Sequence, residues 1–178
     1  ESLIVTNAHR INQGENPILN VTDNDFFFVR RENENDICAT VASLITERLP
    51  RTYGTAIKEQ IQIITPSKKG VGGVEALNMA LQEKINPPLQ FKNEKTAHGT
   101  IFREGDRVMQ IANNYELEWE KNGITGLGLF NGDIGRIIKI YKNDSYMTID
   151  FDDKLVDYPF DLLDELELAY AITVHKSQ

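Results

Sequence analysis

The sequence has few of the residues that mark disulfide-rich, metal-binding or membrane-spanning proteins. Its 178 residues include one cysteine, Cys38, so no disulfide can form within the chain. The three histidines lie far apart and lack metal-ligand spacing, which argues against a zinc site. No apolar run approaches the roughly 18 residues that a bilayer-spanning helix requires. We therefore expect a cytoplasmic protein without a metal site and without a membrane partner.

The sequence also lacks the loop Gly-x4-Gly-Lys-Ser/Thr, whose backbone N–H groups and lysine hold the phosphates of a nucleotide. No nucleophile–base pair or carboxylate pair stands in a recognisable pocket motif, so we expect no catalytic residue in this chain. The sequence does not begin with methionine, and it ends directly after a polar cluster. From this we expect a piece of a larger protein.

Positive charge is scarce. The formal net charge is −8, and residues 89–165 carry nine Lys and Arg against fifteen Asp and Glu. Proteins that bind nucleic acid through a broad electrostatic face are usually basic. Any contact with nucleic acid is therefore expected to be local, through particular loops.

Alternating helix-period and strand-period patterns fill the first half of the chain, which predicts an α/β architecture with a parallel sheet. The expected helices are 2–13, 34–49 (ended by Pro50) and 74–85, and the expected strands are 26–29 and 61–65.

After Pro88 the pattern changes to short strands separated by turns rich in Gly, Asn and Asp, which predicts a small antiparallel barrel. The expected strands are 107–111, 134–141, 146–151 and 154–160, with a loop over 115–129. Residues 168–173 then form a continuous apolar run, typical of a strand buried on both faces of a parallel sheet.

A polar cluster follows this last strand: Thr173, His175, Lys176, Ser177 and Gln178. Ligands of open α/β sheets bind beyond the carboxyl ends of the strands. Short hydroxyl and amide side chains suit phosphate oxygens, because they donate hydrogen bonds to a passing backbone. From chemistry alone, a polar loop after a core strand is the favoured interpretation.

Several strings resemble one family. Residues 169–178, ending in His-Lys-Ser-Gln, resemble motif V of superfamily 1 helicases. Residues 2–14 resemble the helix after motif IV in the RecD/TraA branch, and residues 65–78 resemble the motif after its second strand. Residues 105–115 and 130–135 resemble the entry to that family's SH3-like insertion. The matches follow the family order over nearly the whole chain.

The resemblance implies the C-terminal motor half of a RecD-like, ATP-dependent DNA helicase. It implies an α/β fold in which a RecA-like parallel-sheet lobe of the P-loop NTPase type (domain 2A) occupies residues 1–96 and 166–178. An all-β SH3-like barrel (domain 2B) would be inserted at residues 97–165. The lobe would be incomplete, because the sequence stops within motif V.

The resemblance also implies 5′→3′ translocation on single-stranded DNA, in repair or recombination. ATP and Mg²⁺ would bind the full-length protein, mainly through an N-terminal RecA-like lobe, and nuclease or repair subunits are possible partners. Lys68 and Lys69 would line the nucleotide cleft. The implied DNA-binding residues are Thr65, Pro66, Asn113, Asn114, Tyr115, Thr173, His175, Ser177 and Gln178. Tyr115 either stacks on a base or packs in the core.

The alternative hypothesis belongs to another class of function. In it the chain is a non-enzymatic interaction module, whose SH3-like barrel binds a protein partner and whose α/β part is a scaffold. The net charge of −8 favours this alternative, and the His-Lys-Ser-Gln terminus favours the helicase.

Overall fold

The computed structural model describes residues 2–176, so Ser177 and Gln178 lie outside the described residues. The chain divides into two compact units, Glu1–Asn33 and Glu34–Gln178. Within the described residues, none of the helices is long and apolar enough to cross a membrane.

The first unit contains helix α1 (Leu3–Asn12), which confirms the expected helix. Ser2 caps it by accepting a hydrogen bond from the N–H of Val5 at 3.3 Å. Asp25 adds a second cap, since its Oδ1 accepts from the N–H of Leu3 at 2.8 Å. A carboxylate at this end also suits the positive end of the helix dipole. Gly14, with φ +77°, takes the left-handed conformation that ends the helix.

The strand expected at 26–29 is absent. These residues carry no regular secondary structure, and Phe27 and Phe28 are 63% and 52% exposed. Their apolar character predicted burial between neighbouring strands, but no strand of the described residues pairs with this segment. The prediction was wrong because an apolar run of four residues specifies burial only when a partner strand is present.

The second unit begins with a helical segment that runs past Pro50. It comprises α2 (Glu34–Ser43), a π-helical turn η1 (Leu44–Arg48) and α3 (Leu49–Tyr53). The expectation that Pro50 ends the helix was wrong. Proline lacks an N–H, and the first turn of a helix needs none, so Pro50 is tolerated just after the π turn. Gly54, with φ +88°, ends the segment, and the short helix α4 (Ile57–Gln60) follows.

Two strands of the second unit form a parallel pair. β1 (Ile63–Thr65) pairs with β11 (Ala171–Thr173), and the expected helix α5 (Val74–Ile85) contacts β11. Among the described residues, this pair is the parallel part of the fold. An extensive parallel sheet, as the α/β pattern predicted, is not what the structure contains.

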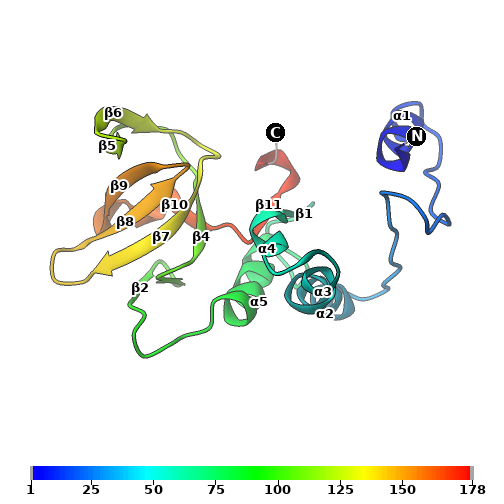
Figure 1. Cartoon of the computed structure of the whole chain (residues 1–178), viewed down its shortest axis with the longest axis horizontal. Coiled ribbons are helices and arrows are strands. Elements are labelled where there is room, and N and C mark those ends of the chain that lie inside the picture. The colour runs from blue at the N-terminus through cyan, green and yellow to red at the C-terminus, as the bar shows by residue number, and fades with distance from the viewer. Residues whose placement is uncertain (1, 177–178) are drawn as a thin grey trace. The chain divides into compact units, whose positions relative to one another are not determined.

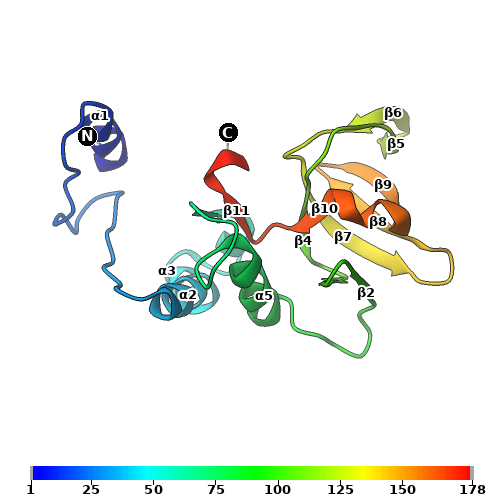
Figure 2. The same cartoon turned by 180° about the vertical axis from the view of Figure 1, so that it is seen from behind.

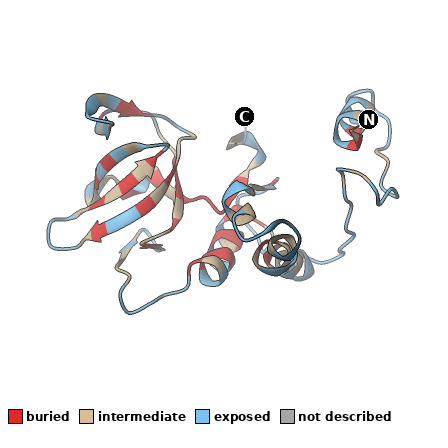
Figure 3. Cartoon of the chain, viewed as in Figure 1, coloured by how far each residue is buried: buried red, intermediate tan, exposed pale blue. Residues whose placement is uncertain are grey.

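The main sheet is antiparallel (Figure 1), and its strands are hydrogen-bonded in the order β10 (Leu166–Leu168), β4, β7, β8, β9, β5 (Asn114–Lys121) and β6 (Ile124–Leu129). Its central strands agree with the sequence-based expectations: β4 (Arg107–Gln110), β7 (Ile134–Tyr141), β8 (Tyr146–Phe151) and β9 (Lys154–Pro159). Buried and less buried residues alternate along β8, as expected for a strand with one face on the core. Figure 3 shows the buried positions running along these strands and α5.

Two hairpins complete the β region. β2 (Glu94–Ala97) pairs with β3 (Thr100–Arg103). β5 (Asn114–Lys121) pairs with β6 (Ile124–Leu129), so the loop expected at 115–129 is instead a hairpin. Its acidic residues obscured the strand pattern, although Leu117 and Trp119 alternate with them toward the inner face.

The apolar run 168–173 is not one strand. The 3-10 helix η2 (Phe160–Glu165) leads into β10 (Leu166–Leu168), which pairs antiparallel with β4. The following strand, β11, pairs instead with β1. Ala169 and Tyr170 between them are buried. One stretch of chain therefore passes from the antiparallel sheet into the parallel pair, as Figure 2 shows in orange and red.

Helix α5 fastens this crossing through buried amides. Asn78 donates to the carbonyl oxygens of Leu168 and Ala171 at 2.8 and 3.0 Å, and accepts from the N–H of Ala171 at 2.7 Å. Gln82 and Asn86 donate to the buried carboxylate of Asp106 at 2.7 and 2.8 Å. Because the three amides recur every fourth residue, they lie on one face of the helix.

Asp106 completes this network. It also accepts from the hydroxyl of Tyr170 and from the backbone N–H of Arg103, both at 2.7 Å. Burial raises the pKa of its carboxyl group, and these hydrogen bonds oppose that change. The network joins α5, β4 and the crossing segment.

Candidate nucleic-acid interface

The carboxyl ends of β1 and β11 lie side by side. Thr65 and Thr173 are partners in the parallel register. Thr65 is buried, and its hydroxyl donates to the carbonyl oxygen of Gly72 at 2.9 Å. Thr173 is partly exposed and Pro66 is exposed. The structure therefore brings these predicted residues together, and it uses the Thr65 hydroxyl to hold the loop that follows β1.

That loop, residues 66–73, reaches the start of α5. At Gly73 a Cβ would come within 2.6 Å of the carbonyl oxygen of Lys69, so the close approach requires glycine. The N–H groups of Val71 and Gly72 donate to the carboxylate of Glu34 at 3.1 and 3.4 Å. The loop is thus held from β1 on one side and from α2 on the other.

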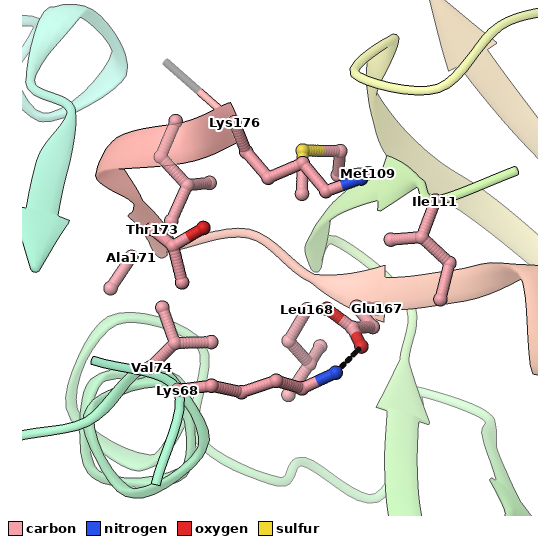
Figure 4. Close-up of a pocket in the computed structure, with 10 residues that line it drawn as sticks. Lys68, Val74, Met109, Ile111, Glu167, Leu168, Ala171, Thr173 and Lys176 are labelled. Carbon is pink, nitrogen blue, oxygen red and sulfur yellow. Dashed lines mark hydrogen bonds and ion pairs between the residues drawn. The ribbon is translucent and has the colours of Figure 1, made fainter. Parts of the chain in front are cut away.

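The two lysines assigned to a nucleotide cleft lie in this loop, and both are exposed. Lys68 Nζ lies 2.8 Å from Oε1 of Glu167, and this carboxylate raises the pKa of Lys68. The pair stands beside a cavity of about 220 Å³ that Thr173 and Lys176 also line (Figure 4). That volume is below the roughly 300–1,000 Å³ of typical small-molecule sites. The described residues therefore do not form a complete ATP site.

The last described residues extend the site toward the antiparallel sheet. Val174–Lys176 form a 3-10 turn in which His175 is exposed. Lys176 Nζ donates to Oδ1 of Asn131, and the N–H of Asn131 donates to Oδ1 of Asn113 at 2.9 Å. This chain of contacts joins the C-terminal segment to the predicted residues at the start of β5. Ser177 and Gln178, predicted for the same site, lie outside the described residues.

The three residues at the start of β5 differ in how far their side chains are engaged. Asn114 donates to Oε2 of Glu165 at 3.0 Å and accepts from the N–H groups of Glu116 and Leu117, so its amide holds the irregularity in β5. Tyr115 is 67% exposed, which rules out the core alternative for its ring. The ring packs edge-on against Phe130 with centroids 5.8 Å apart. Asn113 is exposed apart from its contact with Asn131.

Sequence reasoning missed several residues that build this region. Lys176 and Asn131 were parts of the quoted motifs but were not assigned to the site, although they form its bridging contact. The amides of Asn78, Gln82 and Asn86 were also missed. Each of these amides follows directly after one of the apolar residues Leu77, Leu81 and Ile85, so the amides and the apolar residues share the same spacing along the helix. Such a pair of adjacent stripes indicates a helix whose two neighbouring faces are both covered by the rest of the protein.

Across residues 2–176, there is no group of three or more His, Cys, Asp or Glu side chains placed to hold a metal ion.

Comparison with known proteins places the β region in a family. Residues 77–151 match the family described as the SH3 domain of ATP-dependent RecD-like DNA helicases. This match overlaps the expected insertion over residues 97–151 and begins within α5.

Two curated relatives cover about two thirds of the chain. The ATP-dependent RecD2 DNA helicase of Deinococcus radiodurans is 35% identical over 66% of this chain, which is 14% of its own length. An uncharacterised protein of Methanocaldococcus jannaschii is 31% identical over 67% of this chain and 11% of its own length. The chain thus spans a small fraction of each relative. Together with the SH3-domain match, this similarity confirms the resemblance seen in the motifs: the chain is similar to RecD-like helicases, and residues 77–151 match the SH3 domain of that family.

Proposed function

We propose that this chain forms part of the single-stranded DNA track of an ATP-dependent RecD-like helicase. The observation that carries the proposal is the bridge from Lys176 through Asn131 to Asn113. It links the C-terminal segment, in which His175 is exposed, to the start of β5, where the ring of Tyr115 is exposed. Donors in a row suit phosphates, and an exposed ring suits a base.

In the full-length protein we propose a RecA-like lobe built on β1, β11 and α5, completed by further segments, with the SH3-like domain inserted at 97–165. ATP and Mg²⁺ would bind mainly through a second, N-terminal RecA-like lobe, and the motor would move 5′→3′ in the cytoplasm during repair or recombination. Nuclease or repair subunits would be its protein partners. Since these residues lack a P-loop, we expect the 178-residue chain alone to hydrolyse no ATP, with or without DNA.

DNA binding tests the proposal most directly. Fluorescence anisotropy with a labelled oligo-dT should show weak binding by the chain and little preference among base sequences. Neutralising two or three phosphates gives a plot of log association constant against log salt concentration with a slope of about −1.4 to −2 at most. The net charge of −8 makes this dependence shallower, because salt also screens the repulsion between the chain and DNA. Tyr115→Ala should weaken binding about 5-fold to 150-fold, from the roughly 1–3 kcal/mol of one stacked base. Tyr53→Ala, an equally exposed tyrosine elsewhere, is the matched control.

Unwinding assays test the residues of the C-terminal segment. In the full-length enzyme, Thr173→Ala or His175→Ala should lower strand separation more than nucleotide binding, because these residues face DNA in the proposal. Substrates with a 5′ or a 3′ single-stranded tail would report the direction of movement. Unchanged unwinding in both variants would remove the role we assign to this segment.

A second candidate function rests on the exposed face of the β5–β6 hairpin. Glu116, Glu118 and Glu120 lie there with Leu127, which is 65% exposed. An acidic and apolar face repels DNA and suits a basic protein segment. If the chain is an interaction module, the unmodified chain should not bind oligo-dT. In that case Leu127→Ser should abolish binding to the basic protein segment. In the helicase proposal, the same variant leaves oligo-dT binding unchanged.

A further inference from the structure

A second cavity lies at the opposite edge of the parallel pair from Thr65 and Thr173. It has a volume of about 310 Å³, with Ile61 and Ile63 lining it from the amino-terminal end of β1. Strands β4 and β7 and the end of α5 supply the other walls. Because Thr65 and Thr173 lie at the carboxyl ends of these strands, this cavity is separate from the proposed DNA track.

Cations gather around this cavity in a chain that is otherwise acidic. Lys58, Lys92, Arg107 and Arg136 line it, and Glu59 is the one carboxylate among its lining residues. All four cations are partly buried. Counting these five groups leaves an excess of three positive charges, against a net charge of −8 for the whole chain. Partly buried charges in excess of their partners call for a counter-ion, because desolvation is otherwise uncompensated.

Arg107 is only partly compensated by the protein. Within residues 2–176, its guanidinium makes one hydrogen bond, from Nη1 to the carbonyl oxygen of Ile61 at 3.3 Å. A guanidinium has five N–H donors, so most of its donor capacity is unused by the protein. Burial and the neighbouring charge of Arg136 lower the pKa of Arg107. Two arginine side chains next to each other in this way suit the paired oxygens of a phosphate group.

Glu59 occupies the position that such an anion would take. Its carboxylate pairs with Nη2 of Arg136, while Nη1 of Arg136 donates to the carbonyl oxygen of Gly105 at 3.2 Å. Glu59 is on the short helix α4 and its side chain is 63% exposed, so it can move away without unpacking the core. Lys92 donates to Oδ1 of Asn86, which places a further cation at the α5 wall.

We propose that this cavity, with Arg107 and Arg136 as its principal donors, binds the diphosphate group of a small molecule such as inorganic pyrophosphate or a nucleoside diphosphate. The three excess positive charges match the charge of a diphosphate better than that of one phosphodiester. The apolar residues Ile61, Ile63 and Ile85 form part of its wall, and a volume of about 310 Å³ suits a small molecule.

Calorimetric titration of the 178-residue chain with inorganic pyrophosphate at low ionic strength tests the site. Arg136→Gln should weaken binding at least about 10-fold, from the roughly 1.5–3 kcal/mol of a charged hydrogen bond expressed as a ratio of dissociation constants. Lys58→Gln should weaken it about 3-fold through the loss of one nearby charge. Glu59→Gln should strengthen it several-fold, since the competing carboxylate is removed. Lys142→Gln, an exposed lysine in the turn between β7 and β8, is the matched control and should change nothing.

The Glu59→Gln variant separates a ligand site from a structural ion pair. If the pair serves only folding, this variant lowers the melting temperature and does not improve pyrophosphate binding, and that result overturns the proposal. Absence of pyrophosphate binding, or equal binding by Arg136→Gln and the unmodified chain, also overturns it. Oligo-dT that binds more tightly than pyrophosphate and competes with it would reassign the cavity to nucleic acid and reject the small-molecule ligand.

Discussion

The antiparallel sheet and the parallel pair differ in how their strands find partners. Strands β7, β8 and β9 follow one another through short turns, and each pairs with its neighbour in sequence. β1 and β11 are three residues long and are separated by most of the second unit. The antiparallel sheet is therefore specified locally, while the parallel pair depends on α5 and the crossing segment. The predicted DNA-contacting residues Thr65 and Thr173 belong to the dependent region.

The largest effect should come from breaking that dependence. Asn78→Ala leaves the buried carbonyl oxygens of Leu168 and Ala171 and the N–H of Ala171 without their partner. Each unsatisfied group costs about 1–3 kcal/mol, so a loss of about 3 kcal/mol or more in the free energy of unfolding is expected in urea titrations.

Hydrogen exchange sharpens this test. In Asn78→Ala, exchange should rise in residues 169–173 and stay slow in β7 and β8. Met79→Ala, at a neighbouring position that is 65% exposed, is the control and should change stability by less than about 0.5 kcal/mol. Equal loosening of both regions would mean that the two sheets form one cooperative unit.

The second effect is a loss of stability in alkali, with one tyrosine reporting on each region. Burial raises the pKa of Tyr158, in β9, and of Tyr170, in the crossing segment, above the ordinary value of 10.0. The stabilisation is complete below pH 10 and falls as the pH rises, because the unfolded chain loses these protons first. Well above pH 10, these two tyrosines together lower the free energy of unfolding by about 2.7 kcal/mol per pH unit, from 1.36 kcal/mol per group.

The free energy of unfolding, measured from pH 9 to 11, should therefore fall with pH about half as steeply in Tyr158→Phe and in Tyr170→Phe as in the unmodified chain. Phenolate absorbance should show these two of the six tyrosines titrating only as the chain unfolds. If Tyr170 ionises in the folded state, the crossing segment opens independently of the antiparallel sheet.

A smaller effect is expected within the antiparallel sheet. Gly126→Ala would place a Cβ against the ring of Trp119, its partner across the β5–β6 hairpin. Overpacking of this kind costs about 1–3 kcal/mol, and the fluorescence of the single tryptophan would report the displacement. Gly72→Ala is the control, since its nearest neighbour would be a side-chain atom of Glu34 at 3.8 Å.

The smallest effect concerns the ion pair between the regions. Lys68 and Glu167 are 55% and 31% exposed, so Lys68→Gln should cost no more than about 0.5 kcal/mol. The difference from the unmodified chain should vanish in 0.5 M NaCl, where charges are screened over about 4 Å. A larger or salt-independent loss would make the ion pair a structural link comparable to Asn78.

The sequence predicted the locally specified region well and the dependent region less well. Strands β7 and β8 were predicted with their observed bounds, because alternation and turn residues act over a few positions. The run 168–173 was predicted as one strand, because apolar character alone cannot show where the partner changes from β4 to β1. The helix through Pro50 was missed because the π turn that accommodates it has no clear sequence signal.

The candidate site shows the same limit. Motif strings brought Thr173 and Asn113 to attention, but the contact through Asn131 that connects their neighbourhoods depends on tertiary structure. The cations around the second cavity were invisible in the sequence, since Lys58, Lys92, Arg107 and Arg136 are scattered through it and the net charge is negative. Their assembly is a property of the fold.

The distance along the chain between β1 and β11 has a consequence during synthesis. At about 5–20 residues per second, roughly a hundred residues take about 5–20 s to follow β1 out of the ribosome. Over that interval the hairpins of the antiparallel sheet can fold, while Ile63 and Ile64 have no partner strand until Ala171 and Ile172 have been synthesised. The nascent chain thus presents an unpaired apolar edge beside a finished domain, a state in which binding by a chaperone competes with aggregation.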